Sequence, residues 1–147
     1  MKELQQQLNQ LWAGKINKLD FNLLASELKI SITVLDNQTT TNYDITFKEV
    51  SAYYFVNNDG ESRKNFYEVE QGDYLELTSI DYFPEGVGEI TLTSAKNDWA
   101  RNYYSGANFA LEFWSSILFL ESNVIEINKT TFGNLLSLNL NREKRCP

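Results

Sequence analysis

The strongest constraint on the fold is a two-residue alternation of apolar and polar side chains, which begins at Leu28. In residues 28–34, four aliphatic residues alternate with Lys, Ser and Thr. Successive side chains of a strand point to opposite faces, so this pattern predicts a strand that is buried on one face. Similar alternation, or a short apolar run, occurs at 43–47, 52–56, 74–82, 90–92, 109–113, 117–120, 124–127 and 136–140.

These segments follow one another at short spacing and are separated by turn residues. We therefore expect a mainly β fold, an antiparallel β-sandwich or partly open barrel of about eight to nine strands. Residues 117–120 are apolar on both faces and predict a central strand. Within 74–82 the apolar positions change phase, which predicts a bulge near Ser79. Residues 57–60 and 84–88 are expected as turns on either side of a hairpin-like unit, and 95–107 as a long loop with one helical turn.

The two ends of the sequence differ from the rest. Leu4, Leu8 and Leu11 have helical spacing, with Trp12 extending the same side and Gly14 as a stop signal. This predicts a helix over residues 1–14. Residues 142–147 are expected to be a flexible tail. A length of 147 residues suits one domain, with boundaries 1–147.

Missing residue types disfavour several classes of site. The chain has no histidine, so it has no Ser-His-Asp triad, no Cys-His dyad and no His-ligated zinc. A single Cys rules out an internal disulfide. We expect no metal, no cofactor and no enzymatic activity. No stretch approaches the roughly 20 apolar residues of a membrane helix, and the first residues are too polar for a signal peptide, so a cytoplasmic location without a membrane partner is expected.

The acidic residues are unevenly distributed. The chain has 20 Asp and Glu against 13 Lys and Arg, a formal net charge of -7. Residues 59–89 hold nine acids and two bases, which equals the whole excess. Such a surface repels phosphates and argues against nucleic acid as a partner. It favours a basic protein partner, with Glu68, Glu70, Asp73 and Asp81 as the candidate contact residues.

Two other interpretations of polar and aromatic residues remain open. The many tyrosines suggest a groove for a small ligand or a carbohydrate, although strand packing accounts for most tyrosines in β proteins. Trp114 lies on the face opposite Phe109, Leu111 and Phe113, so it is a candidate exposed aromatic residue. Glu68 and Glu70, with Glu76 near them across a hairpin, are candidates for the carboxylate pair of a histidine-free hydrolase. Acids on the solvated face of a strand are, however, the ordinary arrangement.

Four stretches in series resemble the YxiG-like family of small bacterial proteins. They are LWAGKI at 11–16, FKEVSAYYFV at 47–56, ELTSIDYFP at 76–84 and NFALEFWSSILFLE at 108–121. The resemblance covers roughly residues 11–127 and implies a β-rich fold. Some members of the family look like immunity proteins that neutralise bacterial toxins, and the resemblance supplies no catalytic residues.

Together these observations predict a non-enzymatic protein-binding module. The specific expectation is an immunity protein that neutralises a cognate bacterial toxin domain through its acidic face. A β-domain that binds a small ligand or a carbohydrate is the alternative. The oligomeric state and the strand order are left open.

Overall fold

The computed structural model describes residues 1–136. The strand expected at 136–140 lies almost entirely outside the described residues, and the tail expected at 142–147 lies wholly outside them. The helical elements are α1 (Lys2–Asn9) and the short 3₁₀ helices η1 (Gly60–Lys64) and η2 (Asp98–Asn102). The strands are β1 (Gly14–Asn22), β2 (Glu27–Asp36), β3 (Thr39–Val56), β4 (Glu76–Leu77), β5 (Ser79–Tyr82), β6 (Ile90–Thr91), β7 (Tyr104–Ser105), β8 (Phe109–Phe113), β9 (Ser116–Ile127) and β10 (Thr130–Phe132).

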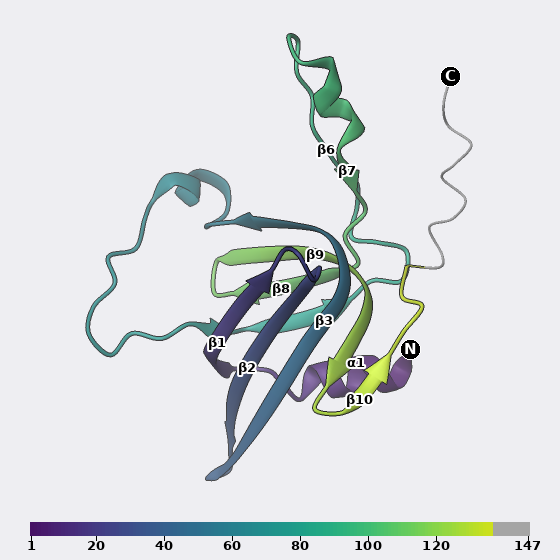
Figure 1. Ribbon diagram of the computed structural model, residues 1–147. Helices are drawn as coiled ribbons and strands as arrows, with labels where there is room; N and C mark the ends of the chain where they lie inside the picture. Colours follow the sequence, from purple (N-terminus) through teal and green to yellow (C-terminus); the bar gives the residue numbers. More distant parts are fainter. Residues whose placement is uncertain (137–147) are drawn as a thin grey trace.

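The main sheet is antiparallel and curls into a barrel (Figure 1). Its strand order is β4-β1-β2-β3-β9-β8-β5, with β10 added to β9. The two outermost strands, β4 and β5, are consecutive in sequence and separated only by Thr78. One short segment therefore pairs with β1 on one side and β8 on the other, which brings the two edges of the sheet together. The expectation of a mainly β, partly open barrel with a short N-terminal helix is confirmed.

The expected bulge near Ser79 is the point where the chain passes from β4 to β5. The Ile16 N–H donates to the Leu75 carbonyl (2.8 Å) on the β1 side. The Thr78 N–H donates to the Glu112 carbonyl (2.8 Å) on the β8 side. The phase change in the sequence thus marks a change of pairing partner.

Two strands are longer than the alternation predicted. β3 joins the segments expected at 43–47 and 52–56, and β9 joins those expected at 117–120 and 124–127. The β3–β9 register shifts between Val50 and Ala52, so the inward positions change parity there. Figure 1 shows both strands strongly curved. β9 pairs with β3 and β8, which confirms the central strand expected at 117–120.

The helix is shorter than expected. α1 ends at Asn9, and Leu4, Leu8 and Leu11 are at most 1% exposed against the barrel core. Trp12 was expected on the same side, but it is 68% exposed because the helix has already ended.

Gly14 is not a helix stop but the buried first residue of β1. A Cβ added there would collide with the Ile32 side chain and lie 2.9 Å from the Leu11 carbonyl oxygen. The residue is therefore a glycine because β1 passes close to β2 and to the end of the helical segment.

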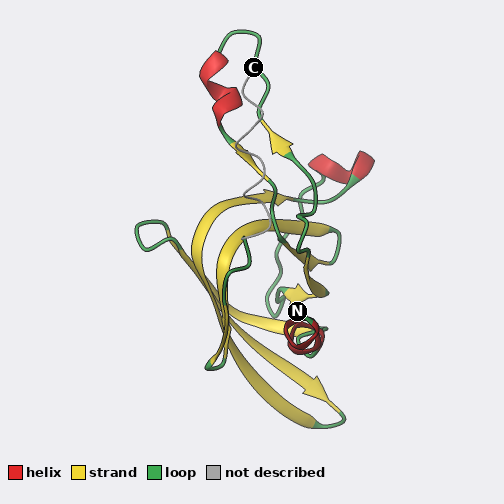
Figure 2. Cartoon of the chain, turned by 90° about the vertical axis from the view of Figure 1, so that its right-hand side faces the viewer, coloured by secondary structure: helices red, strands yellow, loops and turns green. Residues whose placement is uncertain are grey.

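Two segments leave the barrel and return to it. Residues 57–75 form an excursion that contains η1 and no strand. Residues 86–107 form an arm that contains β6, η2 and β7 and projects from the barrel (Figures 1 and 2). The expectation of a hairpin-like unit between the turns at 57–60 and 84–88 is therefore wrong. The turn at 84–86 and the helical turn within 95–107 are confirmed.

Candidate functional site

The structure does not bring the four acidic candidates together. Glu68, Glu70 and Asp73 lie in the excursion and are exposed. Asp81 lies on β5 beside α1, where its Oδ1 accepts a hydrogen bond from Gln5 Nε2 (3.2 Å). The excursion is therefore the acidic surface, and Asp81 belongs to the helix–barrel contact.

Asp73 orders the acidic part of the excursion. Its Oδ2 accepts hydrogen bonds from the Tyr67 hydroxyl (3.0 Å) and from the Glu70 N–H (2.7 Å). The hydrogen bond to Asp73, followed by its negative charge, raises the pKa of Tyr67. Glu68 and Glu70 are thus held on a short closed turn next to Tyr67.

A second set of contacts ties the start of the excursion to the β8–β9 turn. Ser115 Oγ donates to Asn58 Oδ1 (2.9 Å), and Ser116 Oγ donates to Asn57 Oδ1 (3.0 Å). The Asn58 N–H also donates to Ser116 Oγ (3.2 Å). These bonds place the start of the excursion beside the barrel opening.

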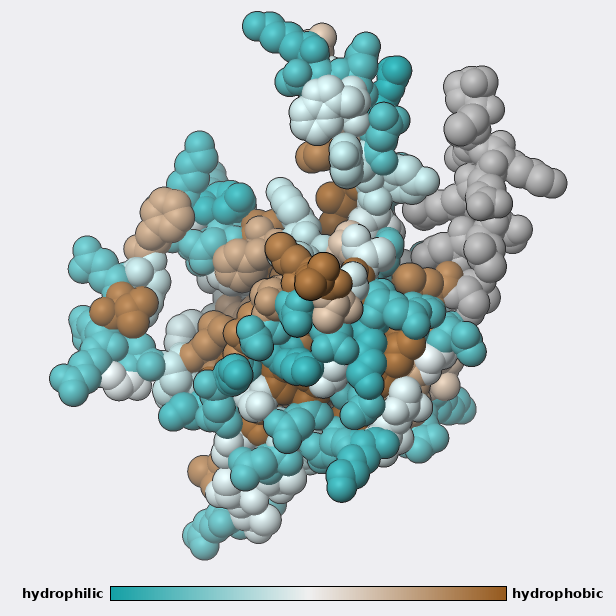
Figure 3. All heavy atoms as spheres, viewed as in Figure 1, coloured by the Kyte–Doolittle hydropathy of each residue, from teal (hydrophilic) through white to brown (hydrophobic). Residues whose placement is uncertain are grey.

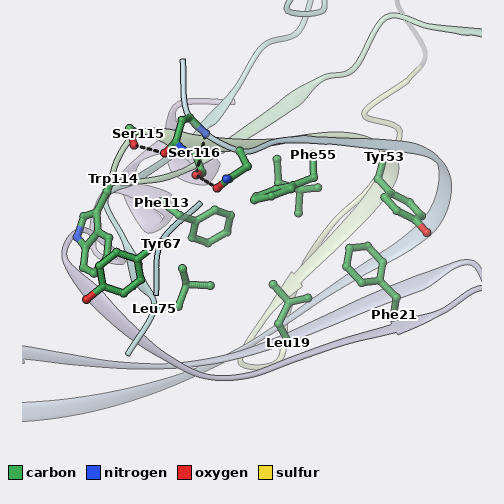
Figure 4. Close-up of a pocket in the computed structure, with 13 residues that line it drawn as sticks. Leu19, Phe21, Tyr53, Phe55, Tyr67, Leu75, Phe113, Trp114, Ser115 and Ser116 are labelled. Carbon is green, nitrogen blue, oxygen red and sulfur yellow. Dashed lines mark hydrogen bonds between the residues drawn. The ribbon is translucent and has the colours of Figure 1, made fainter. Parts of the chain in front are cut away.

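An apolar cleft of about 490 Å³ lies at this opening (Figure 4). Its walls come from the ends of β1 and β3, the excursion, and the β8–β9 turn. α1 contributes no residue to it. The lining residues are Leu19, Phe21, Tyr53, Phe55, Asn57, Asn58, Tyr67, Leu75, Phe113, Trp114, Ser115, Ser116 and Leu118.

The cleft is open above and continuous with the core below. Phe113 and Leu118 are buried at its floor, whereas Phe55 and Trp114 are more than half exposed. Exposed large apolar side chains gathered around a hollow are typical of a binding site and not of an ordinary surface. The exposure expected for Trp114 is confirmed.

Ring packing holds the two long walls together. The rings of Phe21 on β1 and Tyr53 on β3 are 4.5 Å apart between centroids and inclined by 33°. Figure 3 shows apolar atoms gathered between the excursion at the left and the arm at the top, with hydrophilic atoms around them.

The polar side chains of the cleft are largely used within the protein. Asn57, Asn58, Ser115 and Ser116 bond to one another, as described above. Among residues 1–136, no carboxylate lines the cleft. The carboxylates considered from the sequence are on different elements, with Glu76 on β4 and Glu68 and Glu70 in the excursion. The site therefore offers apolar contact and shape, with few free groups for proton transfer.

One partly buried carboxylate has a structural role at the base of the arm. Glu121 on β9 accepts hydrogen bonds from Ser51 Oγ (2.6 Å), Ser105 Oγ (2.7 Å) and the Gly106 N–H (2.9 Å). Burial opposes its ionisation, but these hydrogen bonds, with one from the Ala107 N–H, outweigh burial and hold the pKa of Glu121 below its usual value. The charge therefore fastens the arm to β3 and β9.

A buried amide fastens the segment after β10. Asn108 Nδ2 donates to the Ser122 carbonyl (2.8 Å) and the Leu135 carbonyl (3.3 Å), and its Oδ1 accepts from the Ser122 N–H (2.9 Å). The Tyr82 hydroxyl donates to the same Leu135 carbonyl (3.1 Å). No buried side-chain nitrogen or oxygen within 1–136 lacks a partner.

The fold and the cleft define a small β-barrel protein with an apolar cleft at its open end. The chain belongs to the YxiG-like protein family, whose model matches residues 4–132. It is 24% identical over 127 residues to the protein named Uncharacterized protein YxiG from Bacillus subtilis (strain 168), a match that covers 82% of this chain and 88% of that protein. Within the described part of the chain, no helix is long and apolar enough to cross a membrane.

Proposed function

We propose that this protein is a non-enzymatic binding module for a partner protein that presents an apolar side chain within a basic surface. The observation that carries the proposal is the shared boundary of the cleft and the acidic excursion. Tyr67 and Leu75 of the excursion line the cleft, and Glu68 and Glu70 lie beside Tyr67 in sequence. An apolar anchor and its basic neighbours would therefore be recognised side by side.

The charge of the excursion narrows the class of partner. Residues 57–75 hold Asp59, Glu61, Glu68, Glu70 and Asp73 against Arg63 and Lys64. A toxin domain that acts on nucleic acid needs a basic cleft, so it fits this surface, and an immunity role is our specific form of the proposal. Electrostatic steering would speed such an association. Immunity to such a toxin has to act where nucleic acid is exposed, so the proposal includes a cytoplasmic location.

Photo-crosslinking tests the proposal in the bacterium that encodes the protein. A photoreactive phenylalanine analogue replaces Tyr67 at the cleft or Thr40 near the start of β3. We expect a discrete crosslinked protein from position 67 only. The purified partner should then bind the wild type in a salt-dependent way and bind the variant Glu68→Lys/Glu70→Lys at least about tenfold more weakly.

Asp36→Lys is the matched control, because it reverses an exposed acid outside the excursion. We expect it to leave the affinity for the partner nearly unchanged. The same crosslinked proteins from both positions, or equal affinities for the two charge-reversal variants, would refute the acidic surface as the contact.

A small apolar ligand is the second candidate, and the size of the cleft favours it. Small-molecule sites commonly measure about 300–1,000 Å³, and this cleft falls within that range. Because its Asn and Ser side chains bond to one another, the cleft suits an aliphatic or aromatic ligand better than a sugar. In the variant Trp12→Phe/Trp99→Phe, Trp114 fluorescence titrated with a panel of fatty acids and aromatic acids should shift for a ligand that enters. No shift across the panel would reject this candidate.

A further inference from the structure

One edge of β3 lacks a neighbouring strand where it passes the cleft. β2 pairs with β3 only as far as Leu28 opposite Phe47, and the Val50 N–H then donates to the Ser26 carbonyl (2.9 Å). β9 continues along the other edge to Val56 opposite Ile117. Within residues 1–136, no strand pairs with the outer edge of residues 51–56.

An unpaired edge carries peptide groups that can bond to another chain. Alternate residues of a strand direct their N–H and C=O groups to one edge, so 51–56 presents a row of donors and acceptors to solvent. Natural edge strands are often protected from pairing with another chain by a Pro, a Lys or an inward-pointing charge. This segment, SAYYFV, has none of these.

Apolar hollows flank the same edge on both faces of the sheet. On the concave face, Tyr53 and Phe55 line the cleft. On the convex face, Tyr54 and Phe119 line a groove of about 380 Å³ under the arm. A third hollow of about 350 Å³ lies between the β1–β2 turn and residues 50–53 of β3, and Tyr53 lines all three.

We infer that the outer edge of β3 between Ser51 and Val56 is a strand-addition site for an extended segment of a partner protein. The inference rests on the proposed function for the existence of that partner. An added strand directs alternate side chains to opposite faces, so its apolar residues enter the cleft on one face while the residues between them lie over the groove on the other. Backbone hydrogen bonds supply affinity, and the hollows supply selectivity.

Charge selects the occupant. The edge ends at Val56, directly before the acidic excursion, so basic residues next to the added strand would be favoured. A second copy of this chain would bring another net charge of -7 and another acidic excursion to the same place. We therefore assign the edge to a segment with alternating apolar residues flanked by Lys or Arg.

A synthetic peptide tests this without knowledge of the natural partner. The probe has the core Val-Thr-Phe-Thr-Val between pairs of lysines, and its control carries N-methyl groups on alternate peptide nitrogens, prepared in both registers. We expect the unmodified peptide to shift and protect the amides of residues 51–56 in NMR spectra. The N-methylated form that faces β3 should bind at least about tenfold more weakly, because it loses backbone hydrogen bonds.

Protein variants distinguish binding at the edge of β3 from non-specific hydrophobic binding. Phe55→Ser should weaken peptide binding, whereas Leu35→Ser, which removes an exposed apolar residue at the far end of β2, should not. A peptide flanked by glutamates should bind more weakly than the lysine form. Equal binding of this peptide, no binding of the lysine peptide, or equal binding of all N-methylated forms would overturn the inference.

Two further results would separate strand addition from dimerisation and from the proposed function. A wild-type dimer in sedimentation that disappears in Phe55→Ser would assign the edge to a second copy and overturn the partner assignment. A protein crosslinked at position 67 that binds Phe55→Ser as well as the wild type would reject strand addition while leaving the proposed function in place.

Discussion

Phe21 and Tyr53 pack ring to ring across the barrel opening, although their strands β1 and β3 are not neighbours in the sheet. Phe21 is paired with Leu28 of β2, and the pairing of β2 with β3 stops at Leu28 opposite Phe47. The contact forms because β3 continues past this point and brings Tyr53 to Phe21. It fixes the width of the cleft between two of its walls.

The Phe21–Tyr53 contact should be measurable as a coupling energy. Phe21→Ala and Tyr53→Ala are each expected to lower the free energy of unfolding, with a coupling of about 0.5–1.5 kcal/mol in a double-mutant cycle from urea denaturation. Phe21→Ala combined with Tyr103→Ala in the arm is the control and should be additive. A coupling near zero for Phe21 with Tyr53 would mean that the rings do not stabilise the cleft.

Gly14→Ala should destabilise the protein although the substitution adds one methyl group. The added Cβ collides with Ile32 and crowds the Leu11 carbonyl, so we expect a loss of about 1–3 kcal/mol in the free energy of unfolding. Gly88→Ala is the control because its Cβ meets nothing within 4 Å. Equal stability of the two variants in urea denaturation would contradict the close approach.

Asn108→Asp should be strongly destabilising. The substitution replaces the donor that serves the carbonyls of Ser122 and Leu135 with an acceptor in a site that is 1% exposed. We expect a loss of about 2–4 kcal/mol, since buried carbonyls lose their partner and a carboxyl group is buried near them. Asn102→Asp on the exposed surface of the arm should change stability by less than about 0.5 kcal/mol.

Glu121 should make stability depend on pH in the acid range. Its pKa in the folded protein is lower than in the unfolded chain, so its contribution is present above the unfolded value of about 4.3 and is lost as pH falls through the folded pKa. We expect Glu121→Gln to cost about 1–2 kcal/mol at pH 7 and to lose less stability than the wild type on acidification.

Urea denaturation across the range from neutral to about pH 3 measures both effects. Glu112→Gln on β8, an exposed position, is the control and should follow the wild type. Parallel acid profiles for wild type and Glu121→Gln would show that another group causes the pH dependence.

Local alternation predicted the fold well wherever a strand keeps one register. The strands at 28–34 and 109–113 were predicted because their inward residues keep one parity throughout. β1 was missed because its register shifts between Ile16 and Lys18, so Ile16 and Leu19 face inward at an odd spacing. The same effect split β3 and β9 into shorter predicted pieces.

The candidate site depended on long-range geometry that alternation does not encode. The acidic segment was recognised from composition, but its division between the excursion and β5 follows from which strands pair. The cleft joins Phe21, Phe55 and Trp114 from three distant segments. Two features of the cleft had a local signal. The exposure of Trp114 was predicted, whereas the apolar alternation of Leu19 and Phe21 was not interpreted as a strand.

The barrel closes at a seam where β4 pairs with β1, and this is its weakest strand pairing. β4 meets β1 through only two residue pairs, Gly14 with Leu77 and Lys15 with Glu76, whereas β2 and β3 are joined over nine. Leu75, directly before this seam, lines the cleft. Breathing of the barrel at the seam and widening of the cleft are therefore expected to be one motion, so a ligand that fills the cleft should slow hydrogen exchange at Ile16.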